Sequence, residues 1–129
     1  MGEFLLVDSD ILIDAGREID EAINFLLENE EANQLAISAV TQMELMIGCR
    51  NKTELRALEQ FLTRFEIIPL DDLTTQRAIE LIKTYHLSHG LLIADALIAA
   101  TAITLQSPLA TKNYKDYRFI ESLKLKKYP

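Results

Sequence analysis

The chain has 129 residues, of which 49% are hydrophobic and 26% charged, a mixture typical of globular proteins and unlike that of disordered chains. This length suggests one domain over residues 1–129, and the single cysteine, Cys49, excludes a disulfide framework within the chain and fits a reducing compartment. No apolar run reaches the roughly 18 residues of a membrane-spanning helix, and no signal peptide is visible, so we expect a cytoplasmic protein with no membrane partner.

Acidic and basic residues are unevenly distributed along the chain. The net charge is −7, from 13 Lys and Arg against 20 Asp and Glu, which on its own argues against a nucleic-acid partner. However, residues 1–31 contain ten acidic residues and one basic residue, whereas residues 112–127 contain six basic and two acidic ones. A basic C-terminal edge beside an acidic pocket would guide a phosphate chain toward bound metal, and a solvated tail is the alternative.

The first predicted element is a buried strand over residues 4–7, followed directly by Asp8. A short, continuous apolar run is typical of a strand in a parallel sheet. Binding sites in α/β folds form outside the carboxyl ends of such strands, so Asp8 is expected at the mouth of the sheet. Ser9 or Asp10 is positioned to cap a short helix over residues 11–15.

Strands and helices alternate through the rest of the chain. Apolar residues that recur three or four positions apart predict helices, at residues 18–29, 40–48, 52–65, 71–86 and 93–106. Short apolar runs predict further strands, at residues 35–38, 66–70, 108–111 and 122–125. This alternation indicates an α/β fold with a mainly parallel central sheet of four to five strands and helices on both faces.

Under this topology, acidic positions gather at the carboxyl ends of strands or at the starts of adjacent helices: Asp8, Glu44, Asp95 and the segment 111–116. Magnesium takes oxygen ligands and uses only a few carboxylates, and clustered carboxylates repel one another without a cation. Asp95 lies in the nearly all-apolar segment 91–102, where a carboxylate must be paired, protonated, metal-bound or at a helix end. Convergence of these acids would indicate a metal site, whereas an N-cap is the alternative role of Asp95.

The other polar positions also have local explanations. Ser38 or Thr41 is positioned to cap the helix that follows the second strand. Thr41 and Glu44 match the Thr-x-x-Glu capping box, in which the two side chains bond each other's backbone N–H groups. Asn113 and Asp116 lie in a polar segment where both residue types favour turns.

Four short motifs, in order along nearly the whole chain, resemble those of PIN-domain ribonucleases. They are Val7-Asp8-Ser9-Asp10-Ile11-Leu12-Ile13, Ser38-x-x-Thr41-x-x-Glu44-Leu45-x-x-Gly48, Asp95-Ala96-Leu97-Ile98-Ala99-Ala100 and Ala110-Thr111-Lys112-Asn113-Tyr114-Lys115-Asp116-Tyr117. Each motif alone is weak, whereas all four in this order are fairly specific. The chain is most similar to the VapC-type toxins of bacterial and archaeal toxin–antitoxin pairs.

The resemblance implies catalytic roles for particular acids. Asp8, Glu44 and Asp95 match the acidic metal-binding triad of the family. Asn113 matches the fourth position of the family's site, where members have Asp or Asn. Asp116 follows closely and is a second candidate for the fourth catalytic group, acting directly or through water.

The resemblance also implies supporting roles around the acids. Thr111 would help to orient a ligand, and Ser9 lies beside the first acid. Asp10 stands where the family often has Asn, so it either adds a charge beside the site or only caps the helix. Three basic residues are candidates for contacts with RNA phosphates, with a solvated face as the alternative: Lys112, Lys115 and Arg118.

As a whole, the resemblance implies a PIN-like three-layer sandwich and an endoribonuclease that hydrolyses RNA phosphodiester bonds with Mg²⁺ or Mn²⁺. The resemblance further suggests a homodimer and inhibition by a cognate antitoxin protein that covers the acidic site. A basic antitoxin side chain would suit such a pocket electrostatically. A role in RNA maturation instead of toxicity also fits the family.

Two other functions remain open from the residues alone. Haloacid-dehalogenase-like phosphatases also begin with a strand that ends in Asp-x-Asp, the first acid acting as nucleophile, and Asp71-Asp72 would mimic their later acidic pair. The short chain and the lack of a clear lysine motif count against this fold. The other alternative is a catalytically degenerate PIN module that only binds a partner, for which Asn113 leaves room.

Overall fold

The computed structural model describes residues 3–129, and its centre is a sheet of five strands. The strands are β1 (Phe4–Val7), β2 (Gln34–Ser38), β3 (Glu66–Ile68), β4 (Leu109–Ala110) and β5 (Leu125–Lys126). Their order in the sheet is β3-β2-β1-β4-β5, and every neighbouring pair is parallel. The predicted α/β fold and parallel sheet are therefore confirmed, with β5 at the edge.

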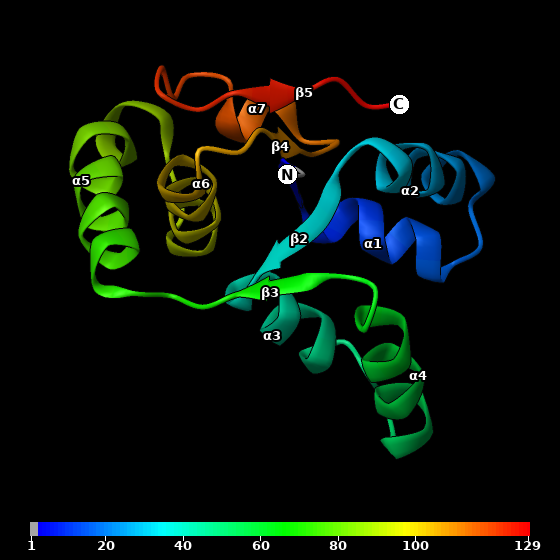
Figure 1. Ribbon diagram of the computed structural model, residues 1–129. Coiled ribbons are helices and arrows are strands. Elements are labelled where there is room, and N and C mark those ends of the chain that lie inside the picture. Colours follow the sequence, from blue (N-terminus) through cyan, green and yellow to red (C-terminus); the bar gives the residue numbers. More distant parts are fainter. Residues whose placement is uncertain (1–2) are drawn as a thin grey trace.

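Helices cover both faces of this sheet. They are α1 (Ser9–Gly16), α2 (Asp20–Ala32), α3 (Ala39–Ile47), α4 (Lys52–Leu62), α5 (Asp72–His89), α6 (Ile93–Leu105) and α7 (Tyr114–Tyr117). Figure 1 shows α5 and α6 on one side of the strands and α1 and α2 on the other, which gives the expected three layers. None of the helices in residues 3–129 is long and apolar enough to cross a membrane.

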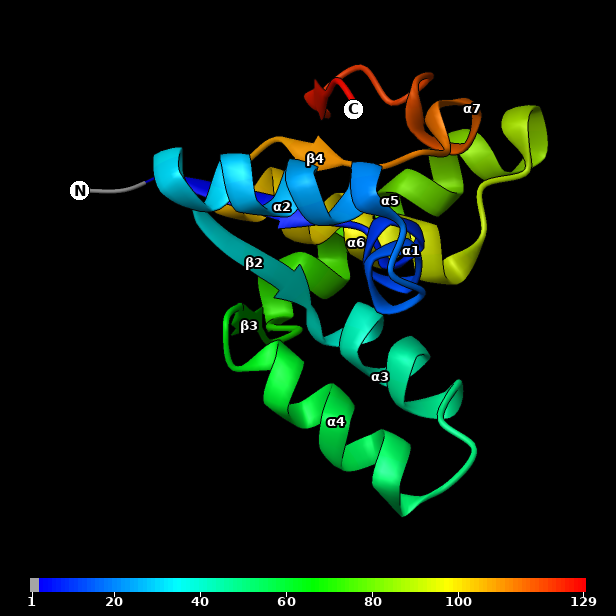
Figure 2. The same ribbon diagram turned by 90° about the vertical axis from the view of Figure 1, so that its right-hand side faces the viewer.

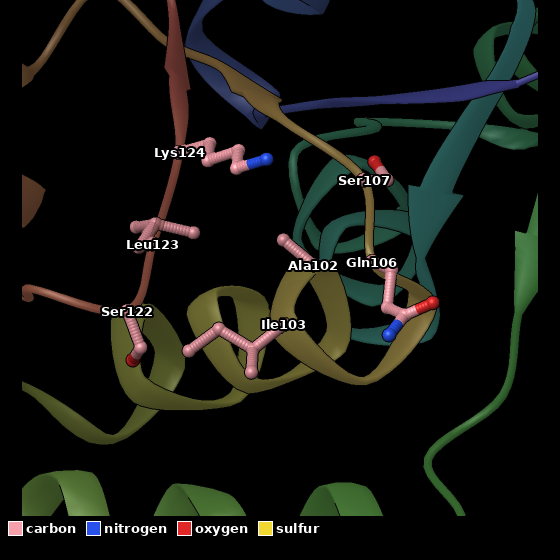
Figure 3. Close-up of a pocket in the computed structure, with 7 residues that line it drawn as sticks. All are labelled: Ala102, Ile103, Gln106, Ser107, Ser122, Leu123 and Lys124. Carbon is pink, nitrogen blue, oxygen red and sulfur yellow. The ribbon is translucent and has the colours of Figure 1, made fainter.

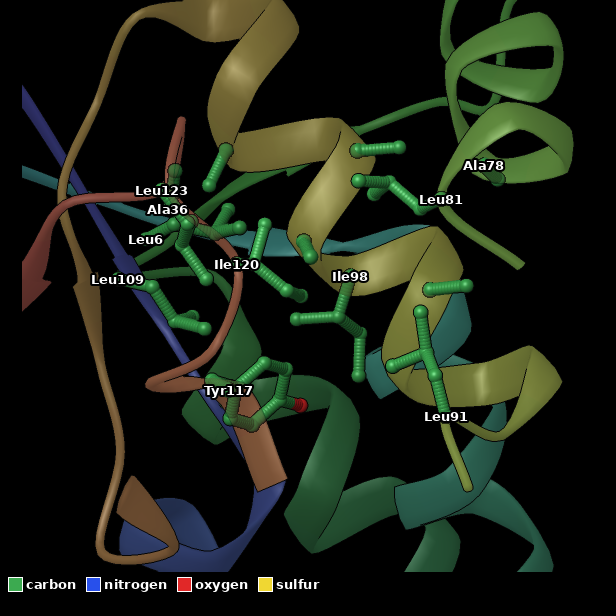
Figure 4. Close-up of a cluster of buried hydrophobic side chains, with 14 residues drawn as sticks. Leu6, Ala36, Ala78, Leu81, Leu91, Ile98, Leu109, Tyr117, Ile120 and Leu123 are labelled. Carbon is green, nitrogen blue, oxygen red and sulfur yellow. The ribbon is translucent and has the colours of Figure 1, made fainter. Parts of the chain in front are cut away.

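Strand β1 is apolar along its whole length because helices cover both of its faces. Its side chains alternate between two cores, as the pleat of a strand requires. Leu6 enters the core beneath α5 and α6, together with Ile98 of α6 and Tyr117 of α7 (Figure 4). Leu5 and Val7 enter the core beneath α1, α2 and α4. A fully buried leucine contributes roughly 1.5–3 kcal/mol relative to an exposed one, so both cores hold β1 in the middle of the sheet.

The structure differs from the predicted boundaries at the end of β3 and at the end of α5. Strand β3 ends at Ile68, two residues before the predicted end, because Pro69 has no N–H to donate to a neighbouring strand. Helix α5 then continues to His89, through residues predicted as a loop. It ends at Gly90, whose φ of 72° is left-handed and is readily adopted by glycine at a helix C-terminus.

Helix α7 is absent from the predicted elements. Its four residues make a single turn, which is too short to show a periodic apolar pattern. Tyr117 at its end is nevertheless almost fully buried, with 1% of its surface exposed. The turn therefore attaches the segment after β4 to the core, next to the carboxyl edge of the sheet.

Candidate active site

The parallel strands bring several polar residues to one edge of the sheet. Asp8 follows β1, and Thr111 follows the neighbouring strand β4. The backbone N–H of Asp8 donates to the carbonyl of Ala110 at 2.9 Å, so the two strand ends are in register. In Figure 2 the arrow of β2 points toward the side of the molecule where α1, α3 and α7 lie. The predicted position of Asp8 at the mouth of the sheet is thus observed.

The Asp8 carboxylate is buried, with only 5% of the residue exposed. Its Oδ2 accepts a hydrogen bond from the Thr111 hydroxyl at 2.8 Å, and its Oδ1 accepts one from the Ser9 N–H at 2.9 Å. Asp8 is therefore itself the N-cap of α1, and the expectation that Ser9 or Asp10 holds that position is wrong. Burial and the nearby charge of Asp10 raise the pKa of Asp8 to about 6, against the opposing effect of these hydrogen bonds.

Asp95 lies in the first turn of α6 but does not cap it. The N-cap is Leu92, which has no side-chain capping bond, so the N-cap interpretation of Asp95 is wrong. Its Oδ1 instead accepts a hydrogen bond from the Tyr117 hydroxyl at 3.1 Å. Burial raises the pKa of Asp95, the Tyr117 hydrogen bond lowers it, and the charges of Asp116 and Asp10 raise it further.

Glu44 projects from α3 and is exposed. Ser38 is the N-cap of α3, accepting from the Val40 N–H at 3.1 Å, and no capping box joins Thr41 to Glu44 in the described residues. The capping-box interpretation is therefore wrong. Partial burial and, after it, the charge of Asp95 raise the pKa of Glu44. The charge of Asp95 also raises the pKa of Asp8, so Asp95 interacts with both of these acids.

Asp10 connects α1 to the segment after β4. Its Oδ2 accepts from the Lys112 N–H at 3.0 Å and lies 3.3 Å from the Thr111 hydroxyl, while Oδ1 accepts from the Ile11 N–H at 2.7 Å. The Lys112 ammonium forms an ion pair with Asp14. Asp10 thus contributes both a charge beside Asp8 and a bond that fixes the loop.

The remaining candidates lie on and around α7. The Asn113 N–H donates to the Thr111 hydroxyl oxygen at 3.0 Å, and the Asn113 side chain is exposed. Asp116 is also exposed, and its charge acts on Asp95. Lys115 and Arg118 lie on either side of Asp116 in the chain and are exposed. Asp116 is therefore coupled electrostatically to the site through its charge, whereas Asn113 interacts with Thr111 through its backbone.

The donor chemistry of the site fits a hard divalent cation. Asp8, Asp95 and Glu44 offer anionic oxygens whose charged forms are penalised by burial and by neighbouring acids, a cost that a bound cation removes. Within residues 3–129, no three His, Cys, Asp or Glu side chains form a group that could hold a metal ion as they stand. Magnesium usually keeps several waters and takes only one or two protein carboxylates, a number that Asp8 and Asp95 would match.

A cleft of about 490 Å³ opens beside Glu44, between α1 and the connection from α3 to α4. Arg17 and Arg50 lie in its walls, so cations as well as carboxylates face it. Arg50 is bonded to Glu54 at 2.7 Å. Glu44 lines this cleft, whereas Asp8 and Asp95 do not.

The sequence of this site has known relatives. A profile of the PIN domain matches residues 5–121. The chain belongs to the PIN-domain family. It is 36% identical over 121 residues to Ribonuclease VapC10 of Mycobacterium tuberculosis (strain ATCC 25618 / H37Rv), covering 93% of this chain and 90% of that protein. It is 33% identical over 128 residues to Ribonuclease VapC1 of Methanocaldococcus jannaschii, covering 96% of this chain and 86% of that protein.

Solved structures of similar fold are also known for this PIN domain. A crystal structure of VapBC2 from Rickettsia felis, bound to a DNA fragment from its promoter, matches with a TM-score of 0.84 at 30% identity, over 98% of this chain and 99% of that chain. A toxin–antitoxin complex from Klebsiella pneumoniae matches with a TM-score of 0.78 at 32% identity, over 92% and 94% of the two chains. The resemblance to VapC-type PIN domains is therefore confirmed.

A second cavity of the PIN domain lies away from the acids. It has a volume of about 400 Å³ and lies between the end of α6 and the segment that leads into β5 (Figure 3). Gln106, in its wall, is eleven residues beyond Asp95, which corresponds to about 16 Å along a helix axis. This cavity is therefore not part of the acidic site.

Tyr117 is the site residue that the sequence did not single out. It was part of the fourth motif, but a lone tyrosine in a polar segment carries no signal of burial. Burial and the charges of Asp8 and Asp95 hold the pKa of Tyr117 far above its usual value, so the hydroxyl keeps its proton and remains a donor. The apolar positions that follow it, Ile120 and Leu123, are the one indication that this segment packs on the core.

Proposed function

We propose that this protein is a metal-dependent endoribonuclease and the toxin of a toxin–antitoxin pair. The observation that carries this proposal is the proximity of Asp8, Asp95 and Glu44 at the carboxyl edge of the sheet, where the charge of Asp95 acts on both of the other acids. The similarity to proteins named as VapC ribonucleases supports RNA as the substrate. Mg²⁺ or Mn²⁺ would be held by Asp8 and Asp95, with Glu44 assisting.

The chemistry requires a nucleophile for the phosphodiester and a way to neutralise its charge. When bound, a divalent cation lowers the pKa of a coordinated water and polarises the phosphate. The side chains of this protein hold that arrangement in place. Thr111 fixes the Asp8 carboxylate through Oδ2, and Ser9 fixes it through Oδ1, while each oxygen keeps a second lone pair for a ligand. Asp116, whose charge acts on Asp95, is our candidate for orienting the attacking water.

The fold argues against the haloacid-dehalogenase-like phosphatase alternative, because it places Asp71-Asp72 away from Asp8. Asp71 caps α5 by accepting from the Thr74 N–H at 2.8 Å. This end of α5 lies beside the end of α6, since Arg77 bonds Thr104 at 3.2 Å. Asp95 is at the opposite end of α6. The acidic pair at the start of α5 therefore cannot join Asp8 as a phosphatase site would require.

Cleavage of RNA in Mg²⁺ or Mn²⁺ tests the proposed activity. Asp8→Asn and Asp95→Asn keep the shape of each side chain and remove its charge, so each is expected to lower the cleavage rate at least about a hundredfold. Asp20→Asn makes the same change on an exposed turn of α2 and should leave the rate unchanged. Cleavage that persists in EDTA, or in both site variants, would contradict a metal-dependent mechanism. A metal-binding protein that cleaves no RNA would point to the degenerate binding module.

We further propose an antitoxin partner and a homodimer. The structural neighbours described as VapBC and toxin–antitoxin complexes support the antitoxin. Around the turn that joins α5 to α6, Leu87, Leu92 and Ile93 are 96%, 63% and 71% exposed, and clustered exposed apolar side chains mark interaction sites. Sedimentation of wild type against Leu87→Ser would reveal a dimer that the substitution weakens. Only monomer at micromolar concentration would contradict the homodimer, and full cleavage with saturating antitoxin would contradict the inhibitory partner.

A further inference from the structure

The Tyr117 hydroxyl lies in an unusual position for a buried phenol. A buried tyrosine normally finds a hydrogen-bond partner for its hydroxyl, and here the partner is a carboxylate, Oδ1 of Asp95, at 3.1 Å. Asp8 is close enough for its charge to act on the same hydroxyl. A phenol has one proton to donate, so it holds one carboxylate oxygen and leaves Oδ2 of Asp95 free of that bond.

The position of this hydroxyl is set by the core and not by solvent. The Tyr117 ring packs among Leu6, Ile98 and Ile120, with its oxygen on the side of α6 (Figure 4). The backbone around it is also held, because the Ile120 N–H donates to the Tyr117 carbonyl at 3.0 Å. A side chain with both ring and backbone fixed can hold a carboxylate in one orientation.

The same segment holds the other central acid. Thr111 bonds Oδ2 of Asp8, and Tyr117 bonds Oδ1 of Asp95, from the two ends of the connection that begins after β4. Each carboxylate therefore receives one hydroxyl from residues 111–117. Partners of this kind orient metal-binding carboxylates, and their loss typically weakens metal affinity about 10- to 100-fold.

We propose that Tyr117 is a positioning residue, whose hydroxyl holds Asp95 beside Asp8 so that Oδ2 of Asp95 is turned toward a divalent cation. This inference rests on the proposed metal-dependent function. Tyr117 is not one of the proposed metal-binding acids. It would act through Asp95, whose carboxylate it contacts.

Tyr117→Phe removes the hydroxyl and keeps the ring that fills the core. Titration of the metal-free protein with Mn²⁺ by calorimetry should show affinity reduced about tenfold or more, while the melting temperature without metal stays near that of the wild type. Cleavage should fall at limiting Mn²⁺ and recover substantially at saturating Mn²⁺, because the acids themselves remain. A purely structural tyrosine would lower the metal-free melting temperature and leave Mn²⁺ affinity unchanged.

Tyr114→Phe is the matched control on the same helix. The Tyr114 hydroxyl bonds the Lys126 carbonyl at 3.3 Å and the Tyr128 N–H at 2.7 Å, so its loss affects the C-terminal segment and not Asp95. Wild-type Mn²⁺ affinity in Tyr117→Phe, with the wild type binding Mn²⁺, would overturn the role of Tyr117 and leave the proposed nuclease intact. A wild type that binds no Mn²⁺ would overturn both.

Discussion

The Thr111 hydroxyl donates a 2.8 Å hydrogen bond to Oδ2 of Asp8, joining two residues that are 103 positions apart in the chain. Both residues directly follow a strand, and the two strands, β1 and β4, are parallel neighbours. Forming the sheet therefore brings the acid and its donor together without any further rearrangement. The geometry of the site depends on strand pairing as much as on the acids.

Thr111→Val tests how much this hydrogen bond contributes. Valine has nearly the same shape but no hydroxyl, so Asp8 loses the donor that lowers its pKa. The ionised carboxylate becomes harder to form, and Mn²⁺ affinity measured by calorimetry at pH 7 should fall about 10- to 100-fold. Thr101→Val is the control, because the Thr101 hydroxyl bonds the Leu97 carbonyl within α6. Equal metal affinities in the two variants would show that Thr111 does not act through Asp8.

The raised pKa of Asp8 predicts a pH dependence of folding in the absence of metal. Between its usual value of 3.8 and about 6, folded Asp8 holds a proton that the unfolded chain releases. The folded state then binds more protons, so the free energy of unfolding falls as pH rises through this window and stays lower above it. Two pKa units correspond to roughly 3 kcal/mol at most.

Asp8→Asn should remove that loss of stability. In EDTA, the variant is expected to be more stable than the wild type by about 1–2 kcal/mol at pH 8, with little difference at pH 4. Denaturant unfolding at the two pH values measures the effect. The control Glu31→Gln changes an exposed charge on α2 and should stay within about 0.5 kcal/mol of the wild type at both. A less stable Asp8→Asn protein at pH 8 would mean that the buried charge is not the dominant cost.

The sequence was sufficient to locate the acids but not their partners. Asp8 and Asp95 were identified because an acid that ends or interrupts an apolar run has few structural uses. The contacts of Tyr117 and Asp10 depend on how the segment after β4 folds back onto α1 and α6. Those contacts are tertiary, and no periodicity in the sequence encodes them.

The two candidate caps of α3 give a paired prediction for stability. Ser38→Ala removes the bond to the Val40 N–H and should lower the free energy of unfolding by about 1 kcal/mol. Thr41→Val should do the reverse, because the buried Thr41 hydroxyl has no hydrogen-bond partner among the described residues, and replacing such a group by a methyl is neutral or stabilising. Denaturant unfolding of both variants measures these changes and so tests which residue caps α3. A larger loss in Thr41→Val than in Ser38→Ala would contradict the assignment of Ser38 as the cap.

The fold was predictable to a different extent at each element. The apolar runs of β1 and β2 are long enough to identify buried strands, and helix periodicity identified α2, α4, α5 and α6. The strand order β3-β2-β1-β4-β5 depends on pairing between strands far apart in the chain, and alternation of elements alone does not specify it. Ser38 and Thr41 both match cap preferences, so only the backbone geometry at the start of α3 could separate them.

The basic residues near the site can be separated by their contacts. Lys112 is paired with Asp14, which occupies its charge. Lys115 and Arg118 are exposed, and neither is in an ion pair within residues 3–129. Both lie at α7, beside Asp116, where an RNA strand reaching the acids would pass. They are therefore better candidates for phosphate contacts than Lys112.

Lys115→Ala and Arg118→Ala should each weaken RNA binding roughly two- to fivefold, the effect of one exposed charge. If each contacts a phosphate, the slope of log affinity against log salt should fall by about 0.7 per substitution, as expected for a single strand. Fluorescence anisotropy in EDTA measures binding without cleavage. Lys124→Ala makes the same change at the start of β5, beside the cavity of Figure 3 and away from the acids, and should leave the slope unchanged. If Lys124→Ala lowered this slope by the same amount, RNA binding would depend only on the total charge of the protein. A position remote from the site would then contribute as much as one beside it.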